Sequence, residues 1–318
     1  MASLLSLPRE LRDTIIGYVV SSDRRAPPLA EKGDKDPEGA ERVQYEDTHW
    51  KDVGNLIYFE RSPSAFQPTC GGLLLACRQL RAETLAQASK IDIPSVLDLL
   101  IVNEEKIWVT WLSIPVKRSP VLEELRINVR MQCDGYDWTR DHDGSARTDN
   151  FTLIFGTQMR NLLYRVLAVG YAGQLPDDKR RALWTGARYK FKNTIRFEHE
   201  YIPHVIVRKL EYHFSDRVYS SVDEGAEIRP HLVRLYVKEW EEILSLLVCY
   251  NVVSTIPVHP GWRLAPERVG GVRIWLGEKM LNADWADLST QYTLLGGESQ
   301  IAREGLSRLL EIRDEHGL

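Results

Sequence analysis

Two amphipathic segments near the start of the chain constrain its fold most, because a short helix is stable only where its apolar face is buried. The first segment, from Leu4 to Val20, repeats apolar residues at intervals of three and four, the spacing of one helix face. We expect Ser6 to cap this helix and Pro8 to occupy its first turn, where a missing N–H breaks no helical hydrogen bond. Its apolar stripe, which either packs in a core or faces a protein partner, consists of Leu7, Leu11, Ile15 and Tyr18 or Val19.

The second segment, Cys70 to Ala88, has the same character and predicts a single helix. Its polar residues, Glu83 among them, are expected to face mainly outward. An αα pair, closed across the chain between the two segments, is the simplest way to bury both apolar faces. The predicted apolar face of this second helix consists of Leu73, Cys77, Leu80 and Thr84, with Leu74, Leu85 and Ala88 beside them.

The chain between the two helices has a different composition. Residues 21–42 mix both charge signs with proline and glycine and offer almost nothing apolar to bury. We therefore interpret residues 21–68 as a flexible, solvated insertion. Only Val53 to Glu60 regains apolar character there, which fits either a short strand or a loop.

Together, the two helices resemble the F-box motif, in the F-box-like form found among filamentous-fungal proteins. That motif reads roughly Leu-Pro-x-Glu-Leu in its first helix and Val-Cys-Arg-x-Trp in a later one; LPRELRDTIIGYV and LLLACRQLRAETL follow these patterns here. The resemblance implies a module that docks on the Skp-type adaptor of a cullin–RING ubiquitin ligase, while the remaining domain recruits a substrate. The adaptor-binding residues that it implies are Leu7, Pro8, Leu11, Ile15, Cys77, Arg78 and Leu80.

The chain departs from the family pattern in two ways. An ordinary F-box is compact, whereas here an insertion separates the two halves. Leu80 stands where the motif has tryptophan, so a large aromatic anchor of the kind that dominates interfaces is missing. The alternative is that the two helices simply cover the following domain, because Leu7 and Leu11 would show the same pattern in that role.

From residue 91 onward, strand and helix patterns alternate. Leu97 to Val102 is an apolar run that suits a strand covered on both faces, and we interpret Lys106 to Leu112 as a short helix. A strand with alternating apolar and polar residues follows. The strand, the short helix and this second strand together have the length of a βαβ unit. The same alternation recurs at 208–214 and 271–277. The residues expected to point inward are Leu125, Ile127, Val129, Leu210, Tyr212, Phe214, Val272, Ile274 and Leu276.

Three longer amphipathic helices are predicted over 151–170, 231–250 and 298–313. The predicted fold class is therefore α+β or α/β. We expect an F-box-like helical module at residues 1–90, followed by one mixed strand and helix domain at 91–318. A mobile loop is expected at about 133–149.

Composition excludes several classes of function. A net charge of −4 argues against a general nucleic-acid binder, which needs excess lysine and arginine to neutralise phosphates. The four cysteines have no zinc-site spacing and are too few for a disulfide scaffold. Charged residues interrupt the first apolar run, unlike a signal peptide, and no run is long enough to span a bilayer. We expect a soluble protein of the cytoplasm or nucleus.

No motif indicates an active site. The Asp-rich segment 134–150 lacks a carboxylate at both ends of a possible EF-hand loop, and HEYIPH at 199–204 has one residue too many for the zinc motif HExxH. The basic and aromatic residues of 179–197 are more typical of a solvated face than of a nucleic-acid surface. We therefore expect no catalytic residue, no metal and no cofactor.

Three hypotheses remain. The first is a substrate-recruiting adaptor of a ubiquitin ligase. The second is a non-catalytic interaction protein whose degenerate module no longer docks, and the least favoured is an enzyme without a recognisable motif. An exposed patch at Leu7, Pro8, Leu11 and Arg78 would favour the first hypothesis, and burial of these residues would favour the second.

Overall fold

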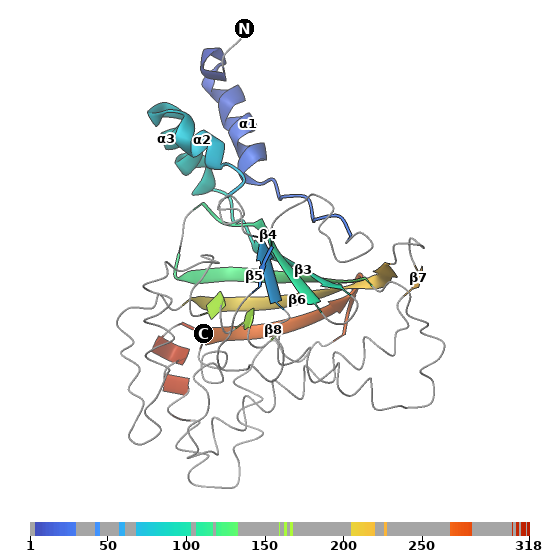
Figure 1. The fold of residues 1–318 in the computed structure, drawn as a ribbon. Helices are drawn as coiled ribbons and strands as arrows, with labels where there is room; N and C mark the ends of the chain where they lie inside the picture. The colour runs from blue at the N-terminus through green and yellow to red at the C-terminus, as the bar shows by residue number, and fades with distance from the viewer. Residues whose placement is uncertain are drawn as a thin grey trace, which may run out of the picture.

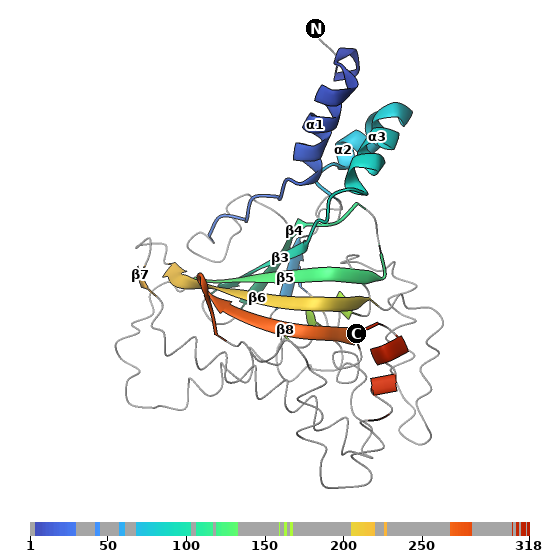
Figure 2. The ribbon, with the colours of Figure 1, turned by 180° about the vertical axis from the view of Figure 1, so that it is seen from behind.

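A small group of helices stands at one side of a mixed sheet in the computed structural model of the chain, and the two opposite views agree on this arrangement (Figures 1 and 2). The structure describes residues 4–29, 42–44, 57–60, 68–102, 106–116, 119–132, 159, 162–163, 166–167, 205–219, 226–227, 268–281, 307, 310–311, 313–315 and 317–318. The expected combination of helices and strands, α+β or α/β, is confirmed, and the sheet contains both parallel and antiparallel pairs.

The helical module consists of the short 3-10 helix η1 (Leu4–Ser6), α1 (Arg9–Val20), α2 (Gly71–Ala76) and α3 (Arg78–Ala88). The residue at the N-cap position of α1 is Pro8 and not Ser6, and Pro8 makes no capping hydrogen bond with its side chain. Ser21 ends α1, as its amide and hydroxyl both donate to the carbonyl of Gly17 at 3.0 and 2.9 Å.

The second amphipathic segment is two helices and not the single helix predicted. Cys77 has extended backbone angles (φ −162°, ψ 166°) and separates α2 from α3. Its thiol accepts a hydrogen bond from the amide of Leu80 at 3.5 Å and thereby caps α3. A side chain that satisfies an amide at the start of a helix favours a break at its own position.

The module has its own apolar core between α1 and the α2–α3 pair. Its buried members are Ile16, Val20, Cys70 and Leu80. Leu73, Leu74, Cys77 and Ala88 pack against them, as predicted for this face, and so do Ile91, Ile93 and Val116 from the chain that leads into and out of the sheet. Burial of this core supplies the stability that isolated short helices lack.

The sheet follows the order β1-β2-β4-β3-β5-β6-β8-β9, with β7 paired to β6. Strands β3, β5, β6 and β8 run parallel to one another, whereas β4 is antiparallel to β3 and parallel to β2. The strand bounds are β1 Arg42–Gln44, β2 Ile57–Glu60, β3 Ser95–Val102, β4 Lys106–Ser113, β5 Val121–Gln132, β6 Ile206–Tyr219, β7 Ala226–Glu227, β8 Val269–Leu276 and β9 Lys279–Met280.

The helix predicted at Lys106 to Leu112 is wrong, because this segment is β4. Its isoleucine, valine, threonine and tryptophan residues favour a strand. Seven of its eight residues are buried, so no alternation appeared in the sequence. The expected βαβ unit is therefore wrong as well: β4 folds back antiparallel along β3, and β5 then pairs parallel with β3 on its other side.

The other strand predictions are confirmed. The inward residues of β5 and β6, and Val272 and Ile274 of β8, are at most 4% exposed, whereas Leu276 is half-buried. In the predicted helix 151–170, the described residues Met159, Leu162 and Val166 are helical and buried. At the other end of the chain, Arg313 donates to the carbonyls of Val269 and Gly270 at 2.7 and 3.0 Å.

Part of the predicted flexible insertion belongs to the sheet. β1 and β2 both lie within it, and β2 pairs with β4. Residues 21–29 also cross the sheet: the amide of Arg24 donates to the carbonyl of Leu112 at 2.8 Å, and Leu29 packs on Leu100, Val102 and Trp108. The loop at 133–149, the helix at 231–250 and the segments 179–197, 199–204 and 297–299 lie outside the described residues.

Candidate protein-docking surface

The helix α1 has two different apolar faces. Ile16 and Val20 face the module core and are 0% and 3% exposed. The predicted stripe lies on the neighbouring face, where Leu11 is 53%, Ile15 38% and Tyr18 74% exposed. These three residues recur at i, i+4 and i+7 and therefore form one continuous strip along the helix, which we call the α1 stripe.

The sequence leaves open whether this stripe packs in the core or faces a partner, and the structure exposes Leu11, Ile15 and Tyr18, whereas Leu7 and Val19 are half-buried. α1 turns the next face of the helix toward the core, about 100° away around the helix axis. That face contains Arg12, which is only 8% exposed. A charged residue at a core position makes the buried face look polar in the sequence, so Ile16 and Val20 do not stand out there as core residues.

A buried ion pair holds α1 against α3. The Arg12 guanidinium donates two hydrogen bonds to the carboxylate of Glu83, from Nε at 3.0 Å and from Nη2 at 2.6 Å. Its remaining Nη1 donates to the carbonyl of Leu7 at 2.6 Å, and Gln79 donates to Glu83 at 3.1 Å. Such a two-pronged pair fixes geometry as well as charge, so it sets how α1 is turned relative to α3.

The ion pair shifts the pKa of both partners in the direction that favours their charged forms. The hydrogen bonds from Arg12, with a second from Gln79, lower the pKa of Glu83 to about 2. In return, the hydrogen bond to Glu83 raises the pKa of Arg12 above its usual value. Glu83 is 9% exposed, so its predicted outward position is wrong, and its charge has a structural role inside the module.

The structure separates the residues that the resemblance implied. Four of them are exposed, namely Pro8, Leu11, Ile15 and Arg78. Leu7 is half-buried. Leu80, by contrast, is 7% exposed and belongs to the module core. Half-buried Cys77 packs against the same core and caps α3. Leu80 therefore stabilises the module from within and does not lie on its surface.

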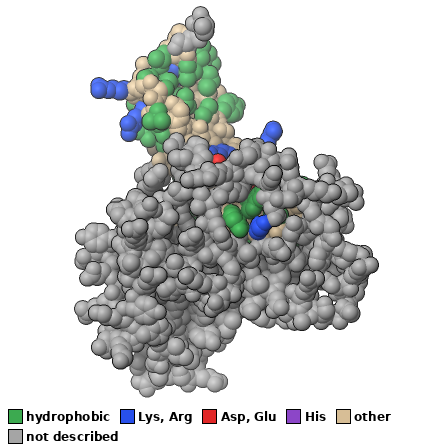
Figure 3. All heavy atoms as spheres, in the orientation of Figure 1, with side chains coloured by type: hydrophobic (Ala, Val, Ile, Leu, Met, Phe, Trp, Pro, Cys, Tyr) green, Lys and Arg blue, Asp and Glu red, His purple; other side chains and the backbone are tan. Residues whose placement is uncertain are grey.

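Other large apolar side chains of the module also reach the surface. Leu75 of α2 is 81% exposed, and Leu5 and Leu85 are 41% and 45% exposed. Figure 3 shows hydrophobic side chains gathered on the visible face of the module, with lysine or arginine side chains at its border. Leu75 was missed in the sequence, because a run of three leucines in a helix does not reveal which of them faces outward.

The described residues offer little for other kinds of site. Among them, no group of three or more histidine, cysteine, aspartate or glutamate side chains is placed to hold a metal ion. Within the same part of the chain, no helix combines the length and hydropathy needed to cross a bilayer.

Comparison of the chain with models of protein families, with curated proteins and with solved structures gave no match. The F-box resemblance therefore stays a prediction from the motif residues.

Proposed function

We propose that the helical module is a docking module that binds a Skp-type adaptor of a cullin–RING ubiquitin ligase, and that the rest of the chain recruits a substrate. The observation that carries this proposal is the α1 stripe, in which Leu11 and Tyr18 are more than half exposed. Contiguous exposed apolar side chains are typical of surfaces that bind another protein.

The stripe is also free to serve a partner, because the module does not use it for its own packing. Ile16 and Val20 supply the α1 contribution to the core, and the Arg12–Glu83 pair fixes the helix on α3. Tyr18 adds an aromatic ring with a polar tip, the kind of side chain enriched at interfaces. The module has Leu80 where the F-box motif has tryptophan, and Tyr18 is a large aromatic residue that it does expose.

The sequence hypotheses can be compared on this basis. An exposed patch was the expectation for a docking module, and burial was the expectation for a module that only covers the sheet domain. Of the four residues in that patch, Pro8, Leu11 and Arg78 are exposed and Leu7 is half-buried, which supports the first of these two hypotheses. A protein partner other than the adaptor would use the same stripe, so the choice between partners rests on a binding experiment.

A pull-down of the purified chain with Skp-type adaptors from its own host tests the proposal. We expect the wild type to bind, and Leu11→Ala and Tyr18→Ala each to weaken binding by about 30-fold, the effect of losing about 2 kcal/mol at an interface anchor. Met280→Ala is the matched control, because Met280 is similarly exposed (38%) but lies on β9. Circular dichroism checks that all variants remain folded.

Two results would contradict the proposal. One is a wild-type chain that binds none of the host's adaptors. The other is a wild-type level of binding by Leu11→Ala and Tyr18→Ala, which would place the adaptor contact elsewhere.

A further inference from the structure

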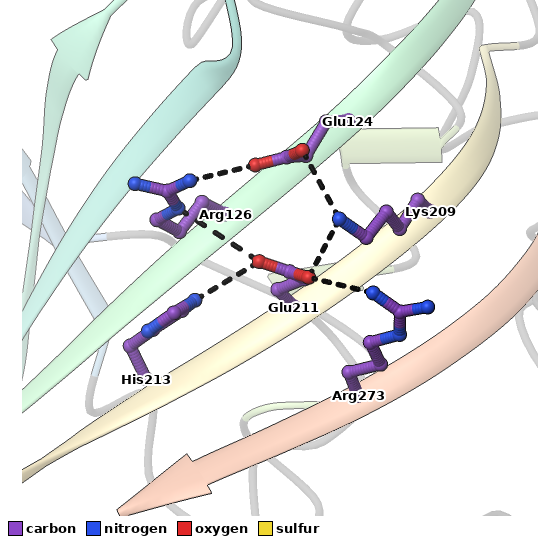
Figure 4. A network of polar contacts seen from close by, with 6 residues as sticks. All are labelled: Glu124, Arg126, Lys209, Glu211, His213 and Arg273. Carbon is purple, nitrogen blue, oxygen red and sulfur yellow. Dashed lines mark hydrogen bonds and ion pairs between the residues drawn. The ribbon is translucent and has the colours of Figure 1, made fainter. Parts of the chain in front are cut away.

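A second cluster of interest lies on the sheet, away from the α1 stripe. Strand pairing places Arg126 of β5, Glu211 of β6 and Arg273 of β8 side by side in one row. Glu124 and Lys209 form the row before it, and His213 lies one step further along β6. Figure 4 shows these six side chains on one face of the sheet, with Glu211 at the centre.

Glu211 is enclosed by positively charged groups and hydrogen-bond donors. Its side chain is 5% exposed, and its carboxylate lies 2.8 Å from Lys209 Nζ and 3.1 Å from His213 Nε2. The two arginines are further away, Arg273 at 3.7 Å and Arg126 at 4.0 Å. Burial favours the neutral form of Glu211, but the hydrogen bonds from Lys209 and His213 outweigh it and lower the pKa, so the carboxylate is charged.

The acceptors of this cluster are already used. Glu124 accepts from Arg126 through one oxygen at 2.9 Å and from Lys209 through the other at 3.3 Å. The two oxygens of Glu211 face Lys209 and His213 at the distances given above. All four carboxylate oxygens therefore have a partner within hydrogen-bond distance.

Some N–H donors of the two arginines, in contrast, have no acceptor in the cluster. Within the described part of the chain, the Arg273 guanidinium makes no hydrogen bond, and its nearest carboxylate oxygen is 3.7 Å away. The buried Nε of Arg126 also lacks a hydrogen-bond partner there. Arg126, Lys209 and Arg273 contribute three positive charges against the two carboxylates, and their side chains are 36–40% exposed while Glu211 is buried. The accessible part of the cluster is therefore positive and rich in N–H donors.

We propose that this cluster binds an oxyanion, a carboxylate or phosphate group of a ligand, with Arg273 as the main contact and Arg126 as the second. A guanidinium presents paired N–H groups that match the two oxygens of such an anion. Glu211 would serve as the positioning residue, because it holds Lys209 and His213 and keeps the cluster from being purely repulsive. The proposal concerns the sheet and does not depend on adaptor docking by the helices.

Isothermal titration of the full chain tests this site, with inorganic phosphate and succinate as separate probes against chloride at equal ionic strength. We expect saturable binding of at least one probe and a loss of about tenfold in affinity for Arg273→Gln. Arg208→Gln is the matched control: it removes the same charge from an exposed arginine on β6, and the Arg208 guanidinium pairs with Glu123. Its affinity should equal that of the wild type, and thermal melting in chloride shows whether both variants fold.

The two probes separate the sources of the anion. Binding of phosphate alone assigns the site to phosphorylated ligands, binding of succinate alone assigns it to carboxylates, and binding of both assigns it to oxyanions generally. The proposal is overturned if neither probe binds saturably. It is also overturned if Arg273→Gln and Arg208→Gln weaken binding equally, since that would reflect net charge and not this cluster.

Discussion

Glu83 carries a full charge inside the helical module, where hydrogen bonds from Arg12 and Gln79 stabilise it. Its pKa is about 2 in the folded chain and near 4.5 without these partners. The folded state therefore binds fewer protons between these values, and its stability should fall as the pH drops from about 5 to about 2. We expect Glu83→Gln to melt at a lower temperature than the wild type at pH 7, and thermal melts across this pH range measure both.

The decisive part of that experiment is the comparison of the wild type with Glu83→Gln at each pH. The difference in melting temperature should shrink as acid protonates Glu83 in the wild type, because both chains then lack the charge. Glu123→Gln is a suitable control, since Glu123 is exposed and its partner Arg208 lies at 3.4 Å. A difference that stays constant down to pH 2 would show that the charge of Glu83 does not stabilise the module.

The Arg12–Glu83 pair also shows where inference from sequence reached its limit. Leu11, Ile15 and Tyr18 are visible in the sequence as part of one apolar stripe, although the sequence does not decide between Tyr18 and Val19 for its end. Most residues of the second segment that pack on the core are visible as well. The sequence does not show which face of α1 is buried. Arg12 can be recognised as a buried charge only together with its partner Glu83, which is 71 residues away. The candidate docking surface was thus found as a pattern, and its exposure came from the structure.

Among the elements, α1 offers a direct test of its orientation through two adjacent isoleucines. Ile16 is 0% exposed and Ile15 is 38% exposed. We expect Ile16→Ala to lower the free energy of unfolding by about 2–5 kcal/mol, because it leaves a cavity in the core. Ile15→Ala should change it by about 0.5 kcal/mol or less. Urea denaturation measures both, and equal losses would contradict the orientation of α1 in the structure.

The strands differed in how well their sequences revealed them. β5 and β6 expose one face more than the other, so their alternating residues were assigned correctly. β4 is buried on both faces and carries no such alternation, and its length suits a short helix equally well. The pairing of β2 with β4 was also beyond the sequence, since strand partners from distant segments leave no local signal.

At the scale of the whole molecule, residues 21–29 connect the helical module to the sheet. They follow α1 directly, and the hydroxyl of Thr69 donates a hydrogen bond to the carbonyl of Ser22 at 2.9 Å. Further on, the chain meets the sheet at Leu112, and the carbonyl of Pro27 accepts from Arg130 Nη2 at 3.0 Å. The composition of this segment suggested a solvated linker, but its backbone carbonyls and amides take part in hydrogen bonds that composition does not show.

Arg130 is the residue through which this connection can be tested. Its guanidinium donates to both oxygens of Asp98, at 2.9 and 2.6 Å, and the Asp98 side chain is only 2% exposed. Arg130→Met should cost about 3–5 kcal/mol of unfolding free energy, because it leaves a buried carboxylate without its partner. It should also speed hydrogen exchange at 21–29, since the contact with Pro27 is lost. Arg208→Gln, at an exposed pair, should change stability by about 1 kcal/mol or less. Unchanged exchange at 21–29 in a destabilised Arg130→Met protein would mean that the contact between Arg130 and Pro27 does not hold the segment on the sheet.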